Sequence, residues 1–155
     1  MSGICQSRVV IITGAGGGLG AAHAREFAKE GASVVVNDIN QEAAGAVVEE
    51  INAAGGNAVA NHSDITHYDD SQNAVKQAIE VFGGLDVVVN NAGINRDRMF
   101  ASLSEAEWDA IMAVHLKGHF CISSHAVQYW RAQSKAGTAV AARIINTTSG
   151  AGLQG

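Results

Sequence analysis

The hydrophobic residues of this chain follow two patterns that alternate along its length. The first is a short continuous run rich in β-branched residues, which is typical of a strand buried on both faces of a parallel sheet. Such runs occupy residues 8–13, 32–37, 85–90 and 143–148, and a weaker run occupies residues 57–61. Each run is predicted to form a strand.

The second pattern places apolar residues at positions i, i+3, i+4 and i+7, which lie on one face of a helix. Two such sets are Ala44, Val47, Val48 and Ile51, and Val75, Ala78, Ile79 and Phe82. A longer stripe comprises Trp108, Ile111, Met112, His115, Leu116 and Phe120. Ser104 and Glu107 have the spacing of a capping box at its start, so we expect one helix from Ser104 to about residue 131. Residues 133–142 are predicted to form a surface loop.

Helix-length segments therefore separate the predicted strands. Parallel strands joined by right-handed crossovers place helices on both faces of one sheet. The pattern predicts an α/β fold, a doubly wound parallel sheet that forms one domain over residues 1–155.

The composition excludes several classes of function. The chain has 155 residues and a formal net charge of −5, with no run of Lys or Arg. Nucleic acids and anionic membranes attract clustered positive charge, so we expect neither as a partner. Cys5 and Cys121 lack the CxxC spacing of a structural zinc site, and two thiols fit a reducing cytoplasm. No signal region and no apolar run of membrane-spanning length is present.

Glycines follow the first predicted strand in the segment Thr13-Gly14-Ala15-Gly16-Gly17-Gly18-Leu19-Gly20. Such a loop lets the backbone approach a pyrophosphate at the start of a helix. Gly16, Gly18 and Ala21 fit the spacing GxGxxA, whereas Gly14, Gly18 and Gly20 fit GxxxGxG. We favour the second spacing because it begins where the strand ends. A tight turn that binds no ligand is the alternative.

Asp38 ends the second predicted strand, close to the ~20-residue spacing at which a carboxylate binds the adenosine ribose of a dinucleotide. Its negative charge would repel a 2′-phosphate, and neither Ala15 nor a neighbour of Asp38 supplies a cation, so NAD is favoured over NADP. Asp38 could instead cap a helix or lie in solvent. A P-loop is excluded because no Gly-Lys-Ser/Thr follows the glycines, but a methyltransferase remains an alternative.

Four motifs in order resemble the short-chain dehydrogenase/reductase family over essentially the whole chain. Thr13 to Gly20 is similar to its TGxxxGxG loop, and Asn90 to Gly93 to its NNAG motif. Asp64-Ile65 resembles its adenine-contacting pair, and Ser149 falls where the family has its catalytic serine. The resemblance implies cofactor contacts at a set of residues: Thr13, Gly14, Gly18, Leu19, Gly20, Asp38, Asp64, Ile65, Asn91, Ala92 and Gly93.

The resemblance also implies a Rossmann-like sheet with strand order 3-2-1-4-5 and hydride transfer between NAD(H) and a secondary alcohol or ketone. Residues 90–100 and 114–120 resemble the branch of 3-oxoacyl thioester reductases and (3R)-hydroxyacyl-CoA dehydrogenases. An acyl thioester is therefore the expected small-molecule substrate, and Arg96 and Arg98 could attract a phosphorylated carrier. The long helix corresponds to half of a dimer surface in the family, so the full-length protein is expected to form a homo-oligomer.

The chain departs from the family in two ways. The family's catalytic tyrosine and lysine follow its serine by little more than a dozen positions, whereas this sequence ends at Gly155 and neither Tyr68 nor Tyr129 has a lysine four residues on. We therefore expect a domain that is truncated after its fifth strand, inactive by itself, or else a non-catalytic nucleotide-binding module. His115 replaces the usual asparagine and could relay a proton or simply pack; its spacing from His119 does not predict a metal site.

Overall fold

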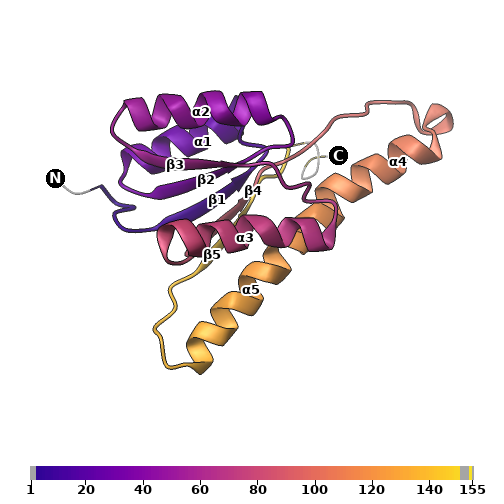
Figure 1. Ribbon diagram of the computed structural model, residues 1–155. Coiled ribbons are helices and arrows are strands. Elements are labelled where there is room, and N and C mark those ends of the chain that lie inside the picture. Colours follow the sequence, from indigo (N-terminus) through magenta and orange to yellow (C-terminus); the bar gives the residue numbers. More distant parts are fainter. Residues whose placement is uncertain (1–2, 151–153, 155) are drawn as a thin grey trace.

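The computed structural model describes residues 3–150 and residue 154. Its centre is a five-stranded parallel sheet in the order β3-β2-β1-β4-β5 (Figure 1). The strands are β1 (Val9–Thr13), β2 (Ser33–Asn37), β3 (Asn57–Asn61), β4 (Val87–Asn90) and β5 (Arg143–Asn146). The predicted doubly wound α/β fold and strand order are confirmed.

Helices cover both faces of this sheet (Figure 1). They are α1 (Gly18–Lys29), α2 (Gln41–Ala53), α3 (Tyr68–Phe82), α4 (Glu105–Met112) and α5 (His119–Lys135). Alternate residues of each strand point to opposite faces. Val10 and Ile12 of β1 therefore join the core beneath α1 and α2, whereas Val9 and Ile11 join the core beneath α3 and α5.

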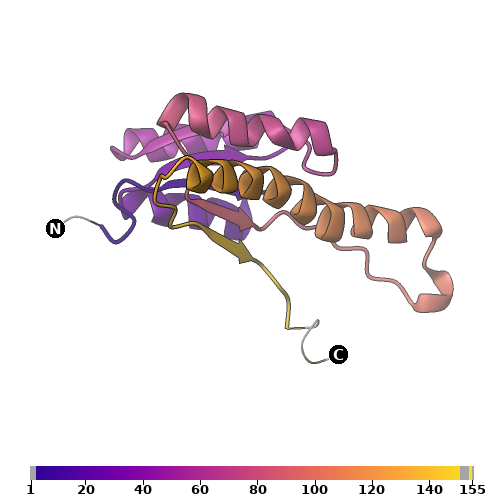
Figure 2. The same cartoon turned by 90° about the horizontal axis from the view of Figure 1, so that it is seen from below.

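The predicted single helix after Ser104 is wrong in detail. The capping box is present, because the Glu107 amide donates to Ser104 Oγ at 3.2 Å and the Ser104 amide donates to the Glu107 carboxylate at 3.0 Å. The helical rod then passes through a π-helical segment, η2 (Ala113–Gly118), and continues as α5 to Lys135 (Figure 2). A π-helical segment changes the helical phase, which a stripe with one fixed period does not predict.

The apolar stripe on this rod is largely exposed. Trp108, Leu116 and Phe120 are each more than half exposed, at 52%, 62% and 61%. The face of α5 that packs on the sheet instead includes Ile122 and Trp130. Among the described residues, no helix has the length and apolar character needed to cross a membrane.

Two further elements differ from the predictions. β5 ends at Asn146 rather than at residue 148, and all of its residues are exposed at the edge of the sheet. A short 3₁₀ helix, η1 (Phe100–Ser102), lies in the loop between β4 and α4. The loop that contains η1 and the segment after β5 both follow the carboxyl ends of parallel strands, where open α/β sheets bind ligands.

Candidate functional site

The loop that leaves β1 requires glycine at each position of the GxxxGxG spacing. Gly14 and Gly18 have positive φ angles of 61° and 51°, which strain any residue with a β-carbon. A β-carbon on Gly20 would overlap the carbonyl oxygen of Gly14, so this glycine lets α1 start close to β1. Ala21, which ends the other spacing, is simply buried in α1.

Gly17 has no such internal reason to be glycine. It is the N-cap of α1 in an extended conformation, with no side-chain cap hydrogen bond. A β-carbon at Gly17 or Gly18 would have no atom within 4 Å. The first turn of α1 carries no acidic residue that would neutralise the positive end of the helix dipole. The free amide groups and the open space beside Gly17 and Gly18 therefore suit an anion.

Asp38 lies directly after β2 and faces this loop. One carboxylate oxygen accepts the Gly16 amide at 2.9 Å, and the other accepts the Asn40 amide at 2.9 Å. A side chain on Gly16 would collide with that carboxylate. Asn40, not Asp38, caps α2 by accepting the Ala43 amide at 3.1 Å, so the capping interpretation of Asp38 is wrong.

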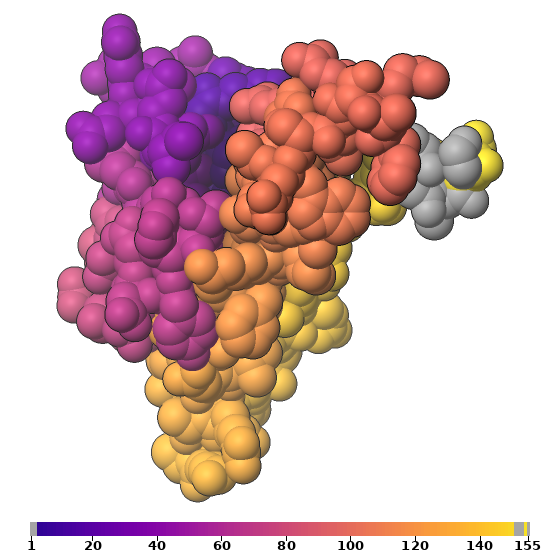
Figure 3. All heavy atoms as spheres, turned by 90° about the vertical axis from the view of Figure 1, so that its right-hand side faces the viewer, coloured from indigo at the N-terminus to yellow at the C-terminus, as the bar shows by residue number. Residues whose placement is uncertain are grey.

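Two neighbouring cavities share Gly14, Asp38 and Gly93 in their walls. The first has a volume of 430 Å³ and is lined by Gly14, Gly17, Leu19, Gly20, Asp38, Asn91, Gly93 and Thr147. The second has a volume of 240 Å³ and is lined by Gly14, Asn37, Asp38, Ile39, Ser63, Asp64, Ile65, Thr66, Ala92, Gly93, Ile94 and Val114. Figure 3 faces this end of the molecule, where indigo N-terminal residues are recessed between purple and salmon segments.

The loop after β4 is tied to the loop after β1 through Thr13. Its buried hydroxyl accepts the backbone amides of Asn91 and Ala92, each at 3.0 Å. The Asn91 side chain donates back to the carbonyl oxygens of Thr13 and Gly14, at 3.1 and 3.2 Å. The two motifs therefore hold one another in place at the wall of the cavities.

The neighbouring Asn90 connects this loop to β5 and α5. Its side-chain amide donates to Asn146 Oδ1 at 2.9 Å and to Ser123 Oγ at 3.0 Å. The Thr147 amide in turn donates to the Asn90 carbonyl oxygen at 2.9 Å. This link brings the segment that follows β5 to the edge of the first cavity, which Thr147 lines.

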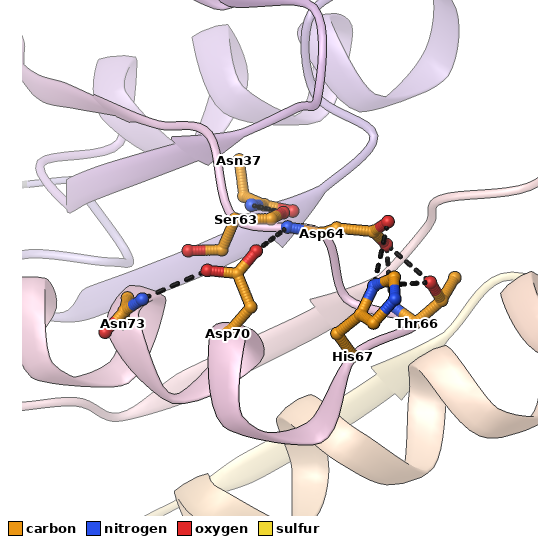
Figure 4. A network of polar contacts seen from close by, with 7 residues as sticks. All are labelled: Asn37, Ser63, Asp64, Thr66, His67, Asp70 and Asn73. Carbon is orange, nitrogen blue, oxygen red and sulfur yellow. Dashed lines mark hydrogen bonds and ion pairs between the residues drawn. The ribbon is translucent and has the colours of Figure 1, made fainter.

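Asp64 follows β3 and is held by its own loop (Figure 4). Asp64 Oδ1 accepts the amide and the hydroxyl of Thr66, at 2.8 and 2.7 Å. Asp64 Oδ2 lies 3.1 Å from Nδ1 of His67. Burial raises the pKa of Asp64, but the hydrogen bonds from Thr66 and the proximity of His67 outweigh it and leave the pKa below its ordinary value.

Ile65 has a different role from its neighbour Asp64. Its side chain is buried, and a β-carbon on Gly118 would press against it at 2.8 Å. Ile65 therefore fixes the loop after β3 against η2 while forming part of the wall of the second cavity.

His115 lies on η2 against the loop after β4. Its Nε2 is 2.8 Å from the carbonyl oxygen and 3.1 Å from the amide nitrogen of Ile94. A β-carbon on Gly93 would press against the His115 ring. Burial lowers the pKa of His119, the Ala92 carbonyl opposes that shift, and His115 adds to it. The described part of the chain holds no group of three residues that could bind a metal ion.

The remaining predicted residues lie on exposed segments. Ser149 is exposed beyond the end of β5. Arg98 Nε forms an ion pair with the Glu107 carboxylate at 3.1 Å, in the first turn of α4. Arg96 donates to the carbonyl oxygen of its neighbour Asn95.

The sequence pattern alone does not single out Gly17, Thr66, His67 or Thr147 as site residues. Gly17 was hidden within a run of glycines, and only the open space beside it distinguishes it. For Thr66 and His67 the available signal is their closeness to Asp64. In an Asp-x-Thr segment the Asp carboxylate can accept a hydrogen bond from the backbone two residues later and so form a turn.

Comparisons with known proteins cover nearly all of the chain. A family model described as short chain dehydrogenase matches residues 8–155. A crystal structure of a short chain dehydrogenase from Mycobacterium avium superposes with a TM-score of 0.96 and 59% sequence identity, covering 99% of this chain and 58% of that one.

Curated relatives also match almost the whole of this chain but only part of their own length. Hydroxyacyl-CoA dehydrogenase ChsB1 of Mycobacterium tuberculosis is 47% identical over 96% of this chain and 49% of its own length. Peroxisomal multifunctional enzyme type 2 of Mus musculus is 43% identical over 96% of this chain and 20% of its own length. The chain thus spans about half the length of the first of these relatives, and a smaller share of the second.

Proposed function

The chain belongs to the short-chain dehydrogenase family, and from this premise we propose that it is the cofactor-binding portion of an NAD(H)-dependent oxidoreductase. The observation that carries the proposal is the open space before the N-terminus of α1, beside Gly17 and Gly18. The uncapped amides there, with Asp38 on the rim, form a cradle that fits a dinucleotide diphosphate and its ribose.

The charges around the cavities support NAD as the cofactor. Asp38 lines both cavities, and no Lys or Arg is among the residues that line them. A 2′-phosphate at this ribose would meet a carboxylate and no cation. The Asp38 carboxylate would instead accept hydrogen bonds from the ribose hydroxyls.

The other residues have parts in the same proposal. Asp64 and Ile65 line the second cavity, which we assign to the adenine. Asn91 and Gly93 line the first cavity, and Ala92 and Gly93 line the second, so we assign to these three residues contacts with the rest of the cofactor.

Bound NAD(H) supplies the hydride that is exchanged with a secondary alcohol or ketone carbon. Ser149 is proposed to hydrogen-bond the substrate oxygen, and His115 to hold the Ile94 backbone beside the site. A 3-hydroxyacyl or 3-oxoacyl thioester is the proposed substrate, because the relatives include a protein named hydroxyacyl-CoA dehydrogenase.

The 155 residues contain no tyrosine with a lysine four positions later. In the family this pair transfers the proton, so we propose that these residues bind cofactor but do not turn over substrate by themselves. A nucleotide-binding module is thus the function proposed for this segment in isolation.

A ligand titration tests the proposal. NADH, NADPH and S-adenosylmethionine are added separately to the purified chain, and the melting temperature is recorded. Stabilisation by NADH above the other two is expected. Stabilisation by S-adenosylmethionine alone, or by none of the three, would overturn the assignment, and rapid NAD-dependent oxidation of a 3-hydroxyacyl-CoA would overturn the expected lack of turnover.

A further inference from the structure

A third cavity lies at the end of the sheet opposite the first two. It has a volume of 260 Å³, and its lining includes Val9 at the start of β1, Leu85 and Asp86 before β4, and Ala142 before β5. Figures 1 and 2 show the loop between α5 and β5 at this end of the sheet, where the N-terminal segment also lies. A ligand in the third cavity would therefore not compete with a dinucleotide at the carboxyl ends of the strands.

The loop between α5 and β5 forms one wall of this cavity and is held at both ends. Arg8 Nη1 donates to the Ala141 carbonyl oxygen at 3.2 Å and to Asp86 Oδ1 at 3.3 Å. The Thr138 amide donates to the Gln133 carbonyl oxygen at 3.0 Å. Because these contacts form the wall before a ligand arrives, binding costs less ordering of the loop.

Two polar side chains of α5 line the same cavity. Tyr129 and Gln133 are four residues apart, which places them on one face of the helix. The Tyr129 ring packs against the core beneath α3 and α5. Within the described part of the chain, neither the Tyr129 hydroxyl nor the Gln133 side-chain amide has a hydrogen-bond partner. Their donors and acceptors are therefore available to a ligand.

Gly84 keeps the Tyr129 hydroxyl accessible. Its φ angle lies outside the left-handed region. Among the described atoms beyond its chain neighbours, the Tyr129 hydroxyl oxygen is the one that a β-carbon here would approach within 4 Å, at 3.5 Å. Neither backbone strain nor tight packing requires glycine at this position, but a side chain would lie against the hydroxyl and cover part of it.

The charges around the third cavity are balanced. Asp86 lines it, and its carboxylate accepts Arg8 Nη1 at 3.3 Å and the Val9 amide at 2.8 Å. No Lys or Arg is among the described residues that line it, so a phosphate would meet a carboxylate and no cation. Arg8 already pairs with Asp86, so an organic cation would find no unpaired carboxylate.

We propose that the third cavity binds an uncharged polyhydroxyl compound of about monosaccharide size. A ligand hydroxyl both donates and accepts hydrogen bonds, and so do the Tyr129 phenol and the Gln133 carboxamide, so each can pair with it in either direction. Phe82 and Leu85 in the lining offer apolar surface to the C–H groups of a ring. The volume lies just below the ~300–1,000 Å³ of sites for drug-sized ligands, which suits one small ring.

Amide NMR of the 155-residue chain tests this proposal. D-glucose, D-glucose 6-phosphate, choline and cyclohexanol are titrated separately. D-glucose should give saturable shifts concentrated at Gly83, Gly84 and Thr138, and the other three compounds should bind at least about threefold more weakly. Absence of these glucose shifts would overturn the proposal, and so would any of the other compounds binding as tightly as glucose. Neither result bears on the dinucleotide, which is titrated separately.

Tyr129→Phe and Gln133→Leu should each weaken glucose binding about twofold to tenfold, the range of one lost hydrogen bond. Gly84→Ala should weaken it as well. Neither of the first two variants loses a side-chain hydrogen bond to a described residue, so both should fold, and the same spectra verify this. Tyr68→Phe is the matched control, because Tyr68 is the other tyrosine of the chain and does not line the cavity. Folded Tyr129→Phe and Gln133→Leu proteins that bind glucose like the wild type would overturn the inference.

Discussion

Replacing Gly17 with alanine should separate ligand binding from folding at the start of α1. The position has an extended backbone that alanine adopts without strain, and the added methyl group would meet no protein atom within 4 Å. Alanine reduces the conformational entropy of the unfolded chain, which stabilises the folded protein by ~0.4–1 kcal/mol. Alanine is also a poorer N-cap residue than glycine, which destabilises the folded protein by a similar amount. The free energy of unfolding should therefore change by less than about 1 kcal/mol.

Dinucleotide binding should respond far more strongly. The methyl group would occupy the space where a diphosphate approaches the α1 amides, so that one or two hydrogen bonds to a charged group are lost, at ~1.5–3 kcal/mol each. The dissociation constant of NADH should rise at least about tenfold, since ~1.4 kcal/mol corresponds to a factor of ten. NADH fluorescence titration measures binding, and urea unfolding measures stability.

Gly20→Ala is the contrasting variant. Its β-carbon would overlap the Gly14 carbonyl oxygen and lie 2.6 Å from the Asn91 side chain, so it should lower stability by ~1–3 kcal/mol or more. A Gly17→Ala protein that is folded and still binds NADH as tightly as the wild type would refute the proposed position of the diphosphate.

Three further predictions concern the same end of the sheet. Asp38→Ala should weaken NADH binding far more than NADPH binding, because it removes a ribose acceptor and also the charge that repels a 2′-phosphate; equal losses in parallel titrations would contradict that role. Thr13→Val should lower the free energy of unfolding by about 2–4 kcal/mol, because it leaves two backbone amides without the buried acceptor, and Thr13→Ser should not. The lowered pKa of Asp64 gives stability that is present above the ordinary carboxyl pKa and lost as the pH falls through the lowered value. Thr66→Val should therefore reduce the stability difference between pH 7 and pH 3 in urea unfolding, and an unchanged difference would count against this linkage.

Much of the architecture could be predicted from local patterns. Strands β1, β2 and β4 are continuous β-branched runs, which are typical of strands buried between two helix layers. Gly14, Gly18 and Gly20 were recognisable because a sharp turn and a close helix both exclude a side chain. The capping box at Ser104 and Glu107 is likewise a purely local signal.

The features that escaped prediction depend on tertiary contacts. The helical rod passes through a π-helical segment at residues 113–118, and the stripe with Trp108 and Phe120 is exposed while Ile122 packs in the core against the sheet. The roles of Thr66 and His67 become visible only once α3 and the loop after β3 are placed together. A sequence pattern contains neither the helical phase nor these distances.

The proposed function requires a dinucleotide in the crevice between the glycine loop and Asp38. Backbone amide NMR of the 155-residue chain, titrated with NADH, locates the bound ligand residue by residue. We expect saturable shifts concentrated at Gly14, Gly17, Gly18, Leu19 and Asp38. Shifts that are absent there, or that gather in the separate groove between α1 and α2 around residues 54–56, would contradict it.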